Sequence, residues 1–270
     1  MKNLPRRAFT LAMLALPLAA RAATGPAMSL EAAISSPTRS ARNVKRDRYR
    51  HPAAILAFFG LRDDETVLEI EPGGGYWTEI LAPYLAPHGH YIAATPPAAA
   101  GPEDAKALAF LKAKLLASPA YGHVPIVPFT PGVPLAPPGS IDMILSFRNL
   151  HDWMANGTVA ANLALIFAAL KSGGVFGIED HRASPLQPQD PKATSGYVRE
   201  DYAVKLITQA GFQLVGRSAI GDNPRDLKNY PKGVWTLPPV LALGAVDRAK
   251  YLAIGESDRW TMKFIKPAAA

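Results

Sequence analysis

The sequence predicts an α/β protein in which a doubly wound, mostly parallel sheet of seven strands is covered by helices. Two observations lead to this prediction. Short apolar segments alternate with helix-like segments along the chain, as they do where parallel strands are buried on both faces by crossover helices. A glycine-rich loop also joins one apolar segment to the helix-like segment after it, and sheets of this kind commonly bind a ligand at such a loop.

Seven segments are candidates for strands and five for helices. The strand candidates are residues 66–71, 90–95, 125–129, 141–147, 175–179, 212–217 and 262–265. The helix candidates are residues 53–59, 77–85, 103–116, 159–170 and 198–210. Gly60, Gly173 and Gly211 follow three of these helices, and we expect them to end those helices because glycine adopts a left-handed backbone without strain.

Four stretches fall outside this alternation. Residues 24–40 are small and polar and are expected to form a loose lead-in to a helical N-terminal extension. Residues 95–102 and 130–139 are rich in proline, glycine and alanine and are predicted to be loops. The many prolines of residues 221–239 prevent long regular structure there. We expect this C-terminal region to be a lid, because large loops in compact domains often cover a site.

The first 22 residues have the order of a signal peptide. A basic start precedes an apolar run that ends in Ala20-Arg21-Ala22, and cleavage after Ala22 fits the small-residue rule. Arg6-Arg7-Ala8-Phe9 resembles a twin-arginine export signal, and a general secretory signal with two arginines is the alternative. The sequence thus predicts an exported, periplasmic protein without a stable membrane anchor after cleavage, with a lead-in (residues 23–47) and one domain (residues 48–267).

Composition excludes several partners and chemistries. Of the 270 residues, 49% are hydrophobic and 19% are charged, which provides ample material for a core. The formal charge of +7 falls to about +3 without the four cations of the signal segment. The basic stretch from Arg39 to Arg50 is expected to form a solvated helix face or to bind the fold's own carboxylates, and no nucleic-acid partner is predicted. The absence of cysteine excludes disulfides, thiolate metal sites and cysteine nucleophiles.

The glycine loop is the most informative segment. In residues 67–79 (VLEIEPGGGYWTE), a strand that carries Glu69 leads through Glu71 into three glycines and then a helix. Glycine permits a tight turn and lets a ligand approach the backbone closely. The segment resembles motif I of class I S-adenosylmethionine-dependent methyltransferases.

Further segments resemble a bacterial group of predicted exported methyltransferases, and together the resemblance covers residues 48–267. They are residues 147–153 (FRNLHDW), 179–183 (EDHRA), 223–226, 233–239 and 254–259 (IGESDR). The resemblance implies the methyltransferase (Rossmann-like) variant of the sheet, with an antiparallel last strand, and S-adenosylmethionine as the cofactor. The cofactor-binding residues that it implies are Glu69, Glu71, Gly73, Gly74, Gly75, Tyr76, Thr95, Arg148 and Asn149.

Two positions depart from the family's pattern. Glu71 stands where motif I usually has its first glycine, and Thr95 stands where an acid normally binds both ribose hydroxyls. A neutral hydroxyl cannot accept two charge-assisted hydrogen bonds. No acid follows the third strand in Phe129-Thr130-Pro131 either, so ribose and adenine recognition is expected to be altered.

Histidines follow two neighbouring strands of the predicted sheet. His151 and Asp152 come after the fourth strand and His181 after the fifth, so all three are expected at the crevice along the carboxyl edge. Histidine suits removal of a proton from a methyl acceptor near neutral pH. We predict a catalytic group of His151, Asp152 and His181, with Asp152 or Asp180 orienting the base; the alternative is that these side chains anchor loops.

Metal binding by the two histidines and nearby carboxylates is a further alternative. The carboxylates are Asp152, Glu179 and Asp180, but the tight ligand spacing of a metal motif is absent from this part of the sequence. We therefore predict no metal ligands. Residues 256–259 (ESDR) are expected in the lid or in a surface ion-pair cluster, and Trp153 and Trp235 either line an acceptor pocket or belong to the core.

The sequence therefore predicts methyl transfer from S-adenosylmethionine to a small-molecule acceptor. The alternative is an exported, non-catalytic ligand-binding protein on a degenerate methyltransferase fold. The missing ribose acid and export from the compartment that makes the cofactor favour that alternative, whereas the many polar groups of the crevice favour an enzyme. The sequence leaves the acceptor and the oligomeric state open.

Overall fold

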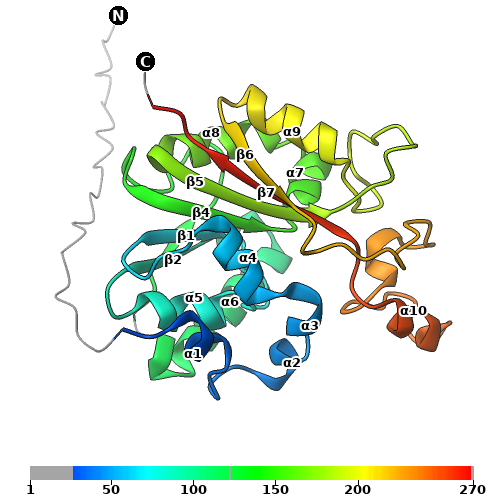
Figure 1. Cartoon of the computed structure of the whole chain (residues 1–270), viewed down its shortest axis with the longest axis horizontal. Helices are drawn as coiled ribbons and strands as arrows, with labels where there is room; N and C mark the ends of the chain where they lie inside the picture. The colour runs from blue at the N-terminus through cyan, green and yellow to red at the C-terminus, as the bar shows by residue number, and fades with distance from the viewer. Residues whose placement is uncertain (1–26, 122, 269–270) are drawn as a thin grey trace, which may run out of the picture.

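The computed structural model describes residues 27–121 and 123–268 (Figure 1). The predicted signal peptide lies outside these residues. The described residues form a seven-stranded sheet in the order β3-β2-β1-β4-β5-β7-β6. Neighbouring strands from β3 to β5 are parallel, whereas β7 is antiparallel to both β5 and β6. The predicted fold class, with its antiparallel strand near one edge, is confirmed.

The predicted elements follow one another along the chain in the predicted order, and additional short helices lie near both ends and, as α7, directly after β4. The strands are β1 (Thr66–Ile70), β2 (His90–Thr95), β3 (Ile126–Pro128), β4 (Ile141–Phe147), β5 (Leu170–His181), β6 (Gln213–Ser218) and β7 (Arg259–Ile265). The α-helices are α1 (Leu30–Ile34), α2 (Ala41–Val44), α3 (Asp47–Arg50), α4 (Pro52–Phe59), α5 (Thr78–Leu85), α6 (Pro102–Leu116), α7 (Leu150–Asn156), α8 (Val159–Ala169), α9 (Glu200–Gln209) and α10 (Arg248–Ile254). Three 3₁₀-helices complete the set: η1 (Ala98–Ala100), η2 (Pro119–Tyr121) and η3 (Gly233–Thr236).

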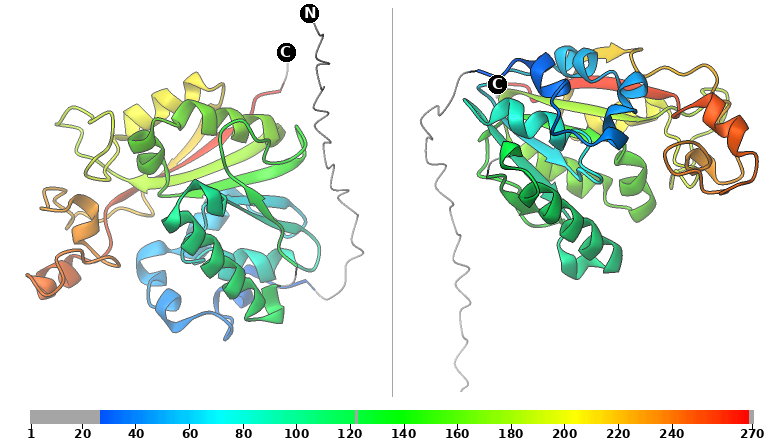
Figure 2. Two further views of the ribbon diagram at one scale, coloured as in Figure 1. Left: turned by 180° about the vertical axis from the view of Figure 1, so that it is seen from behind. Right: turned by 90° about the horizontal axis from the view of Figure 1, so that it is seen from below.

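Helices cover both faces of the sheet (Figure 2). Successive residues of a strand point to opposite faces, and β1 follows this rule. Val67 packs in a hydrophobic cluster with residues of α1, α4, α5 and α6. Leu68 packs in a second cluster with residues of α7, α8 and α9. Because β1 is buried along its whole length, the loop at its carboxyl end is held in place by the core on both sides.

Helix α4 packs directly onto the sheet at a glycine. Gly177 lies in β5, and a Cβ there would come within 2.7 Å of Leu145 Cδ2 and 2.8 Å of Phe59 Cδ1. Such distances are far shorter than a normal contact, so glycine is required for this close approach. Phe59 is fully buried and its ring also contacts those of Phe58 and Phe147. The N-terminal helices are thereby fixed to the centre of the sheet.

The prediction that Gly173 ends a helix is wrong. Helix α8 ends at Ala169, and β5 begins at the buried Leu170, five residues earlier than predicted. Gly173 lies within the strand, with φ 75°, and its N–H donates to Lys266 O at 2.7 Å. Gly60 and Gly211 do follow α4 and α9 with left-handed backbones, as predicted.

The prediction of a loose lead-in is also wrong for the described part of residues 24–40. Helix α1 forms there, and Ser29 Oγ caps it by accepting from Ala32 N–H at 3.1 Å. Ala33 is buried in the cluster that contains α5. Good helix formers behind an N-capping serine make up this segment (LEAAI), and packing against α5 holds the helix in place. None of the helices in residues 27–121 and 123–268 is long and apolar enough to cross a membrane.

Truncation of Phe59 should show how much α4 contributes to stability. We expect Phe59→Ala to lower the free energy of unfolding by about 3–5 kcal/mol, because it removes a fully buried ring and leaves a cavity against Gly177. The measurement is urea unfolding followed by circular dichroism. Phe110→Ala on α6, where the ring is 49% exposed, is the matched control and should change stability by less than about 1 kcal/mol. Equal losses in the two variants would contradict the packing described here.

Candidate functional site

The glycine loop leaves β1 at the carboxyl edge of the sheet and enters α5. Glu71, Gly73 and Gly75 have left-handed backbones, with φ of 47°, 54° and 69°. This conformation strains any residue that carries a Cβ, so Glu71 adopts a glycine-like backbone at a conformational cost. Its N–H donates to Ala94 O at 2.7 Å, which ties the loop to β2. Glu71 stands where the motif that this segment resembles has a glycine, and its backbone is left-handed all the same.

Cationic side chains approach the other glycines closely. A Cβ on Gly74 would lie 3.0 Å from Arg42 Nη2, and one on Gly75 would lie 2.6 Å from Lys114 Cδ. Tyr76 follows, and its buried hydroxyl donates to Asp47 Oδ1 at 2.6 Å. The N-terminal helices thus contact the loop directly.

The two carboxyl groups of the loop region have different surroundings. Glu69 is 1% exposed, and its Oε2 accepts from Tyr91 Oη at 2.5 Å and Thr78 Oγ1 at 3.3 Å. Burial raises the pKa of Glu69 to about 7. Glu69 therefore links β1, β2 and α5 and is turned away from solvent.

Glu71 bridges the carboxyl edge instead. Its Oε2 accepts from Trp153 Nε1 of α7 at 2.8 Å, so the loop after β1 is bonded to the helix after β4. Burial, with a further contribution from Asp152, raises the pKa of Glu71 to about 7. Trp153 belongs to the core, so this bond fixes the loop after β1 against α7.

His151 is oriented by Asp180. The His151 Nδ1 lies 2.9 Å from Asp180 Oδ1, and the His151 backbone N–H donates to Oδ2 at 3.0 Å. Both side chains are buried. Burial alone would lower the pKa of His151, but the Asp180 carboxylate outweighs it and raises that pKa above its ordinary value. Of the two orienting carboxylates that the sequence left open, the structure assigns Asp180 to Nδ1.

His181 lies beside His151 in a different environment. The two ring centroids are 5.2 Å apart, and His181 Nδ1 shares a hydrogen bond of 2.5 Å with Ser257 Oγ. Burial, reinforced by the positive charges of His151 and Arg148, lowers the pKa of His181 well below its ordinary value. His181 is therefore neutral at physiological pH. The Ser257 contact joins residues 76 positions apart and has no signal in the sequence.

A metal site at these side chains is poorly supported by their bonding. His151, Asp180 and His181 offer ligand atoms within 4.8 Å of one another. The Asp180 carboxylate, however, already accepts hydrogen bonds from His151 Nδ1–H and from the backbone N–H groups of both histidines. Nearby guanidinium groups oppose a divalent cation by Coulomb repulsion. The arrangement fits proton transfer better than metal binding.

Residues 256–259 do not form a surface cluster. All four are buried, which corrects that alternative. Glu256 pairs with Arg46 (2.5 Å), Arg50 (3.4 Å) and Arg259 (3.1 Å). Burial would raise the pKa of Glu256, but these guanidinium groups hold it well below its usual range. The sequence identified both charged segments but not that they meet, because 206 residues separate Arg50 from Glu256.

The remaining predicted residues take up distinct positions. Asn149 Nδ2 donates to Ile70 O at 2.9 Å and so ties β4 to β1. Arg148 has a left-handed backbone with φ 65°, and Thr95 is buried at the end of β2.

The Asp152 side chain is 58% exposed, with Oδ2 3.6 Å from His151 Nε2. The predicted lid reaches the site through Trp235 of η3, whose ring centroid lies 5.9 Å from that of His151.

The loop fits one part of S-adenosylmethionine better than the other. Gly73 and Gly74 are exposed, and the space that a Cβ would fill at Gly74 and Gly75 holds cationic side chains. Backbone exposed between such cations suits the carboxylate-bearing end of the cofactor. At the ribose end, β2 finishes in the buried Thr95 and two prolines. The negative charge of Asp104 in α6 contributes to the raised pKa of Glu71.

Comparison with known proteins bears on the fold alone. No protein-family model and no curated protein matches the chain. A S-adenosylmethionine-dependent methyltransferase from Aquifex aeolicus superposes with a TM-score of 0.56 at 14% identity, over 88% of this chain and 99% of that one. One from Methanosarcina mazei gives 0.53 at 13% identity, over 80% and 98%. The [4+2]-cyclase SpnF gives 0.59 at 12% identity, over 87% and 86%. The chain therefore has the fold of class I methyltransferases.

The raised pKa of Glu69 predicts a pH dependence of stability. Folding raises the pKa of Glu69 from 4.5 to about 7, so the folded state binds this proton more tightly than the unfolded state does. The free energy of unfolding therefore falls as the pH rises through that interval. We expect Glu69→Gln to gain stability relative to the wild type between pH 4.5 and 7, by roughly 3 kcal/mol at most.

Urea unfolding of both proteins at pH 5, 7 and 8.5 measures this difference. Glu103→Gln, whose side chain is 85% exposed, is the control and should show no such trend. A difference between Glu69→Gln and wild type that stays constant across the three pH values would show that Glu69 ionises normally.

Proposed function

We propose that the chain transfers a methyl group from S-adenosylmethionine to a small-molecule acceptor. The observation that carries the proposal is the placement of an exposed glycine loop and an oriented histidine at one edge of the sheet. The loop follows β1, and His151 and Asp180 come from the ends of β4 and β5, which are neighbouring strands. Ligands of open α/β sheets bind at this edge.

The loop residues are proposed to hold the cofactor. Exposed backbone at Gly73 and Gly74 meets its methionine portion, with Glu71 and Arg148 at the sides, and Thr95 or Asp104 lies toward the ribose. The cofactor, when bound, supplies an electrophilic methyl group. The protein's contribution is to position the acceptor in line with that group and to exclude water.

His151 is the better general base of the two histidines. Its Nδ1–H donates to Asp180, which leaves the Nε2 lone pair free to accept a proton. Asp180 also stabilises the imidazolium that forms, which is why the pKa of His151 is raised. His181 has a lowered pKa and is a weaker base, so we assign it, with Trp235, to lining the acceptor site. The acceptor would thus carry an O–H or N–H group that loses its proton on transfer.

Export is part of the proposal and rests on the N-terminal sequence. Residues 1–22 have the order of a signal peptide, and the proposed site lies entirely in residues that follow them. A twin-arginine route would carry the folded protein together with a ligand already bound. The fold by itself does not fix the reaction, as the neighbour whose title names a cyclase illustrates, so binding and transfer must each be measured.

Cofactor binding is tested by calorimetric titration. We expect S-adenosylmethionine and S-adenosylhomocysteine to bind the ligand-free chain at micromolar concentration. Gly74→Val should abolish binding, because its side chain displaces Arg42 and covers the exposed backbone. Thermal unfolding of the variant, measured alongside, must remain near that of the wild type. Folded wild-type protein that binds neither ligand would remove the proposal.

Catalysis is tested with a panel of small hydroxyl- and amine-bearing acceptors and a methyl-radiolabelled cofactor. We expect His151→Ala to lower turnover by about 10²–10⁴-fold, the usual contribution of a general base. Asp180→Asn should lower it by at least tenfold, since the amide cannot stabilise the imidazolium. His88→Ala, at a surface histidine paired with Asp63, is the control. Turnover that survives in His151→Ala would leave His151 a structural role only.

A further inference from the structure

The N-terminal helices and the carboxyl edge of the sheet enclose a group of buried charges, named here the arginine cluster: Arg46, Arg50, Arg148, Arg259, Glu179 and Glu256. Glu256 pairs with three of the arginines, as described above, and Arg259 Nε also pairs with Glu179 Oε1 at 3.2 Å. Arg50 lies with its guanidinium carbon 4.5 Å from the Tyr76 ring centroid. The cluster therefore contacts the first residue after the glycine loop.

Positive charge exceeds negative charge in this cluster. Arg46, Arg50 and Arg259 pair with its two carboxylates, and Arg148 has no ion pair among the described residues. The charges of Arg50 and Arg148 also act on the carboxyl group of Glu69. Burial and the neighbouring Arg148 lower the pKa of Arg50, and burial lowers that of Arg148 as well.

Several donors of the cluster are also left over. Among the residues that the structure describes, Arg46 Nη2, Arg50 Nη2 and Arg148 Nε are buried without a hydrogen-bond acceptor. Arg259 Nε and Glu179 Oε1 also lack a hydrogen bond, but these two atoms form an ion pair with each other. Arg50 is 1% exposed, so its free donor points into the protein. Buried charge without a partner costs several kcal/mol, and a cluster that served only to attach the N-terminal helices would be better matched with a third carboxylate.

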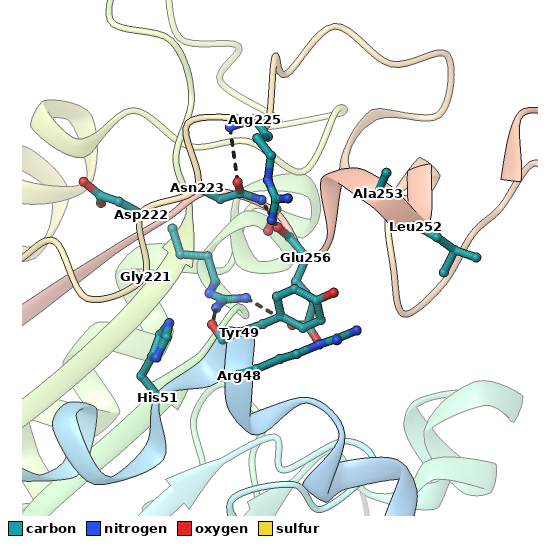
Figure 3. Close-up of a pocket in the computed structure, with 12 residues that line it drawn as sticks. Arg48, Tyr49, His51, Gly221, Asp222, Asn223, Arg225, Leu252, Ala253 and Glu256 are labelled. Carbon is teal, nitrogen blue, oxygen red and sulfur yellow. Dashed lines mark hydrogen bonds and ion pairs between the residues drawn. The ribbon is translucent and has the colours of Figure 1, made fainter. Parts of the chain in front are cut away.

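A cavity of about 460 Å³ adjoins the cluster (Figure 3). Glu256 and Arg259 line it together with Arg48 and Tyr49 of α3 and the loop at residues 221–225. Figure 3 shows Arg48 and Tyr49 on one side and Asn223 and Arg225 on the other. Arg48 and Arg225 form no salt bridge within residues 27–121 and 123–268, which adds to the positive potential. The volume is that of a small-molecule site.

We propose that the arginine cluster is a binding site for an oxyanion group, a carboxylate or a phosphate, of a ligand of the crevice. Arg50 and Arg148 supply free donors, and Arg46 adds a third. Glu256 and Arg259, which pair with or adjoin these arginines, connect the cluster to the cavity. Guanidinium groups pair with planar carboxylates and with phosphates through two parallel hydrogen bonds, which matches this donor set.

Two sources of the oxyanion are consistent with the site. The aminocarboxylate end of the cofactor is one, because Arg50 contacts Tyr76 beside the glycine loop. An anionic methyl acceptor is the other, because Arg148 also acts on His181. Only the choice between these sources rests on the proposed function, since binding of an oxyanion does not require methyl transfer.

The test uses the full chain and inorganic phosphate as the probe. Thermal unfolding and calorimetry at constant ionic strength, with chloride as the balancing anion, should show saturable phosphate binding to the wild type. Arg50→Gln and Arg148→Gln should each weaken it at least tenfold. Arg62→Gln, a surface arginine in an ion pair with Asp64, is the matched control and should bind within twofold of the wild type.

Glu256→Gln supplies a prediction of opposite sign. It removes one of the two carboxylates and should tighten phosphate binding several-fold, although the variant itself is less stable. This variant and Arg148→Gln decide the matter if Arg50→Gln fails to fold. Absence of saturable binding to the wild type, or equal affinity in the wild type, Arg148→Gln and Glu256→Gln, would overturn the proposal.

A second pair of titrations distinguishes the sources. If the cofactor provides the oxyanion, phosphate competes with S-adenosylhomocysteine but not with 5′-methylthioadenosine, which lacks the carboxylate, and Arg50→Gln weakens only the former. If the acceptor provides it, phosphate binds protein saturated with S-adenosylhomocysteine at unchanged affinity. A chain that binds phosphate but neither nucleoside retains the oxyanion site and loses the proposed methyltransferase function.

Discussion

The buried carboxylate of Glu256 connects the N-terminal helices to the sheet, and the candidate site depends on that connection. It forms ion pairs with Arg46 and Arg50 at the two ends of α3 and with Arg259 at the start of β7. A buried carboxylate is tolerated only when such partners surround it, so α3 and the segment before β7 must meet. That meeting places Arg50 on Tyr76 and Asp47 at the Tyr76 hydroxyl, and thereby fixes the glycine loop.

The carboxyl edge of the sheet imposes a second constraint, because it gathers polar groups from several strands in a small volume. His151 and His181 are close neighbours, yet their pKa values move in opposite directions. Burial lowers the pKa of both histidines, but the Asp180 carboxylate outweighs burial at His151, whereas nearby positive charges lower the pKa of His181 further. Two chemically identical side chains thus differ in basicity because of the charges around them.

Glu71 shows how a motif can change in residue type without losing its geometry. Its left-handed backbone is held by the hydrogen bond to Ala94 and by Trp153 on its side chain, and these contacts offset the strain that a Cβ brings. The same carboxyl group bonds the loop to α7. The loop therefore combines a glycine-like backbone with a side chain that has its own partner.

The sequence by itself determined the sheet, most element boundaries and the edge at which the site lies, because these follow from local hydrophobic pattern and from glycine placement. It also placed His151, Asp152 and His181 at that edge. It did not determine that Asp180 orients His151, that Ser257 bonds His181 or that Glu256 binds arginines from α3, because these contacts join residues far apart in the chain. The early start of β5 was likewise decided by tertiary structure, since burial of Leu170 outweighed the loop-like composition that follows it. The helix at Leu30–Ile34, by contrast, has a local signal, because good helix formers follow the N-capping Ser29.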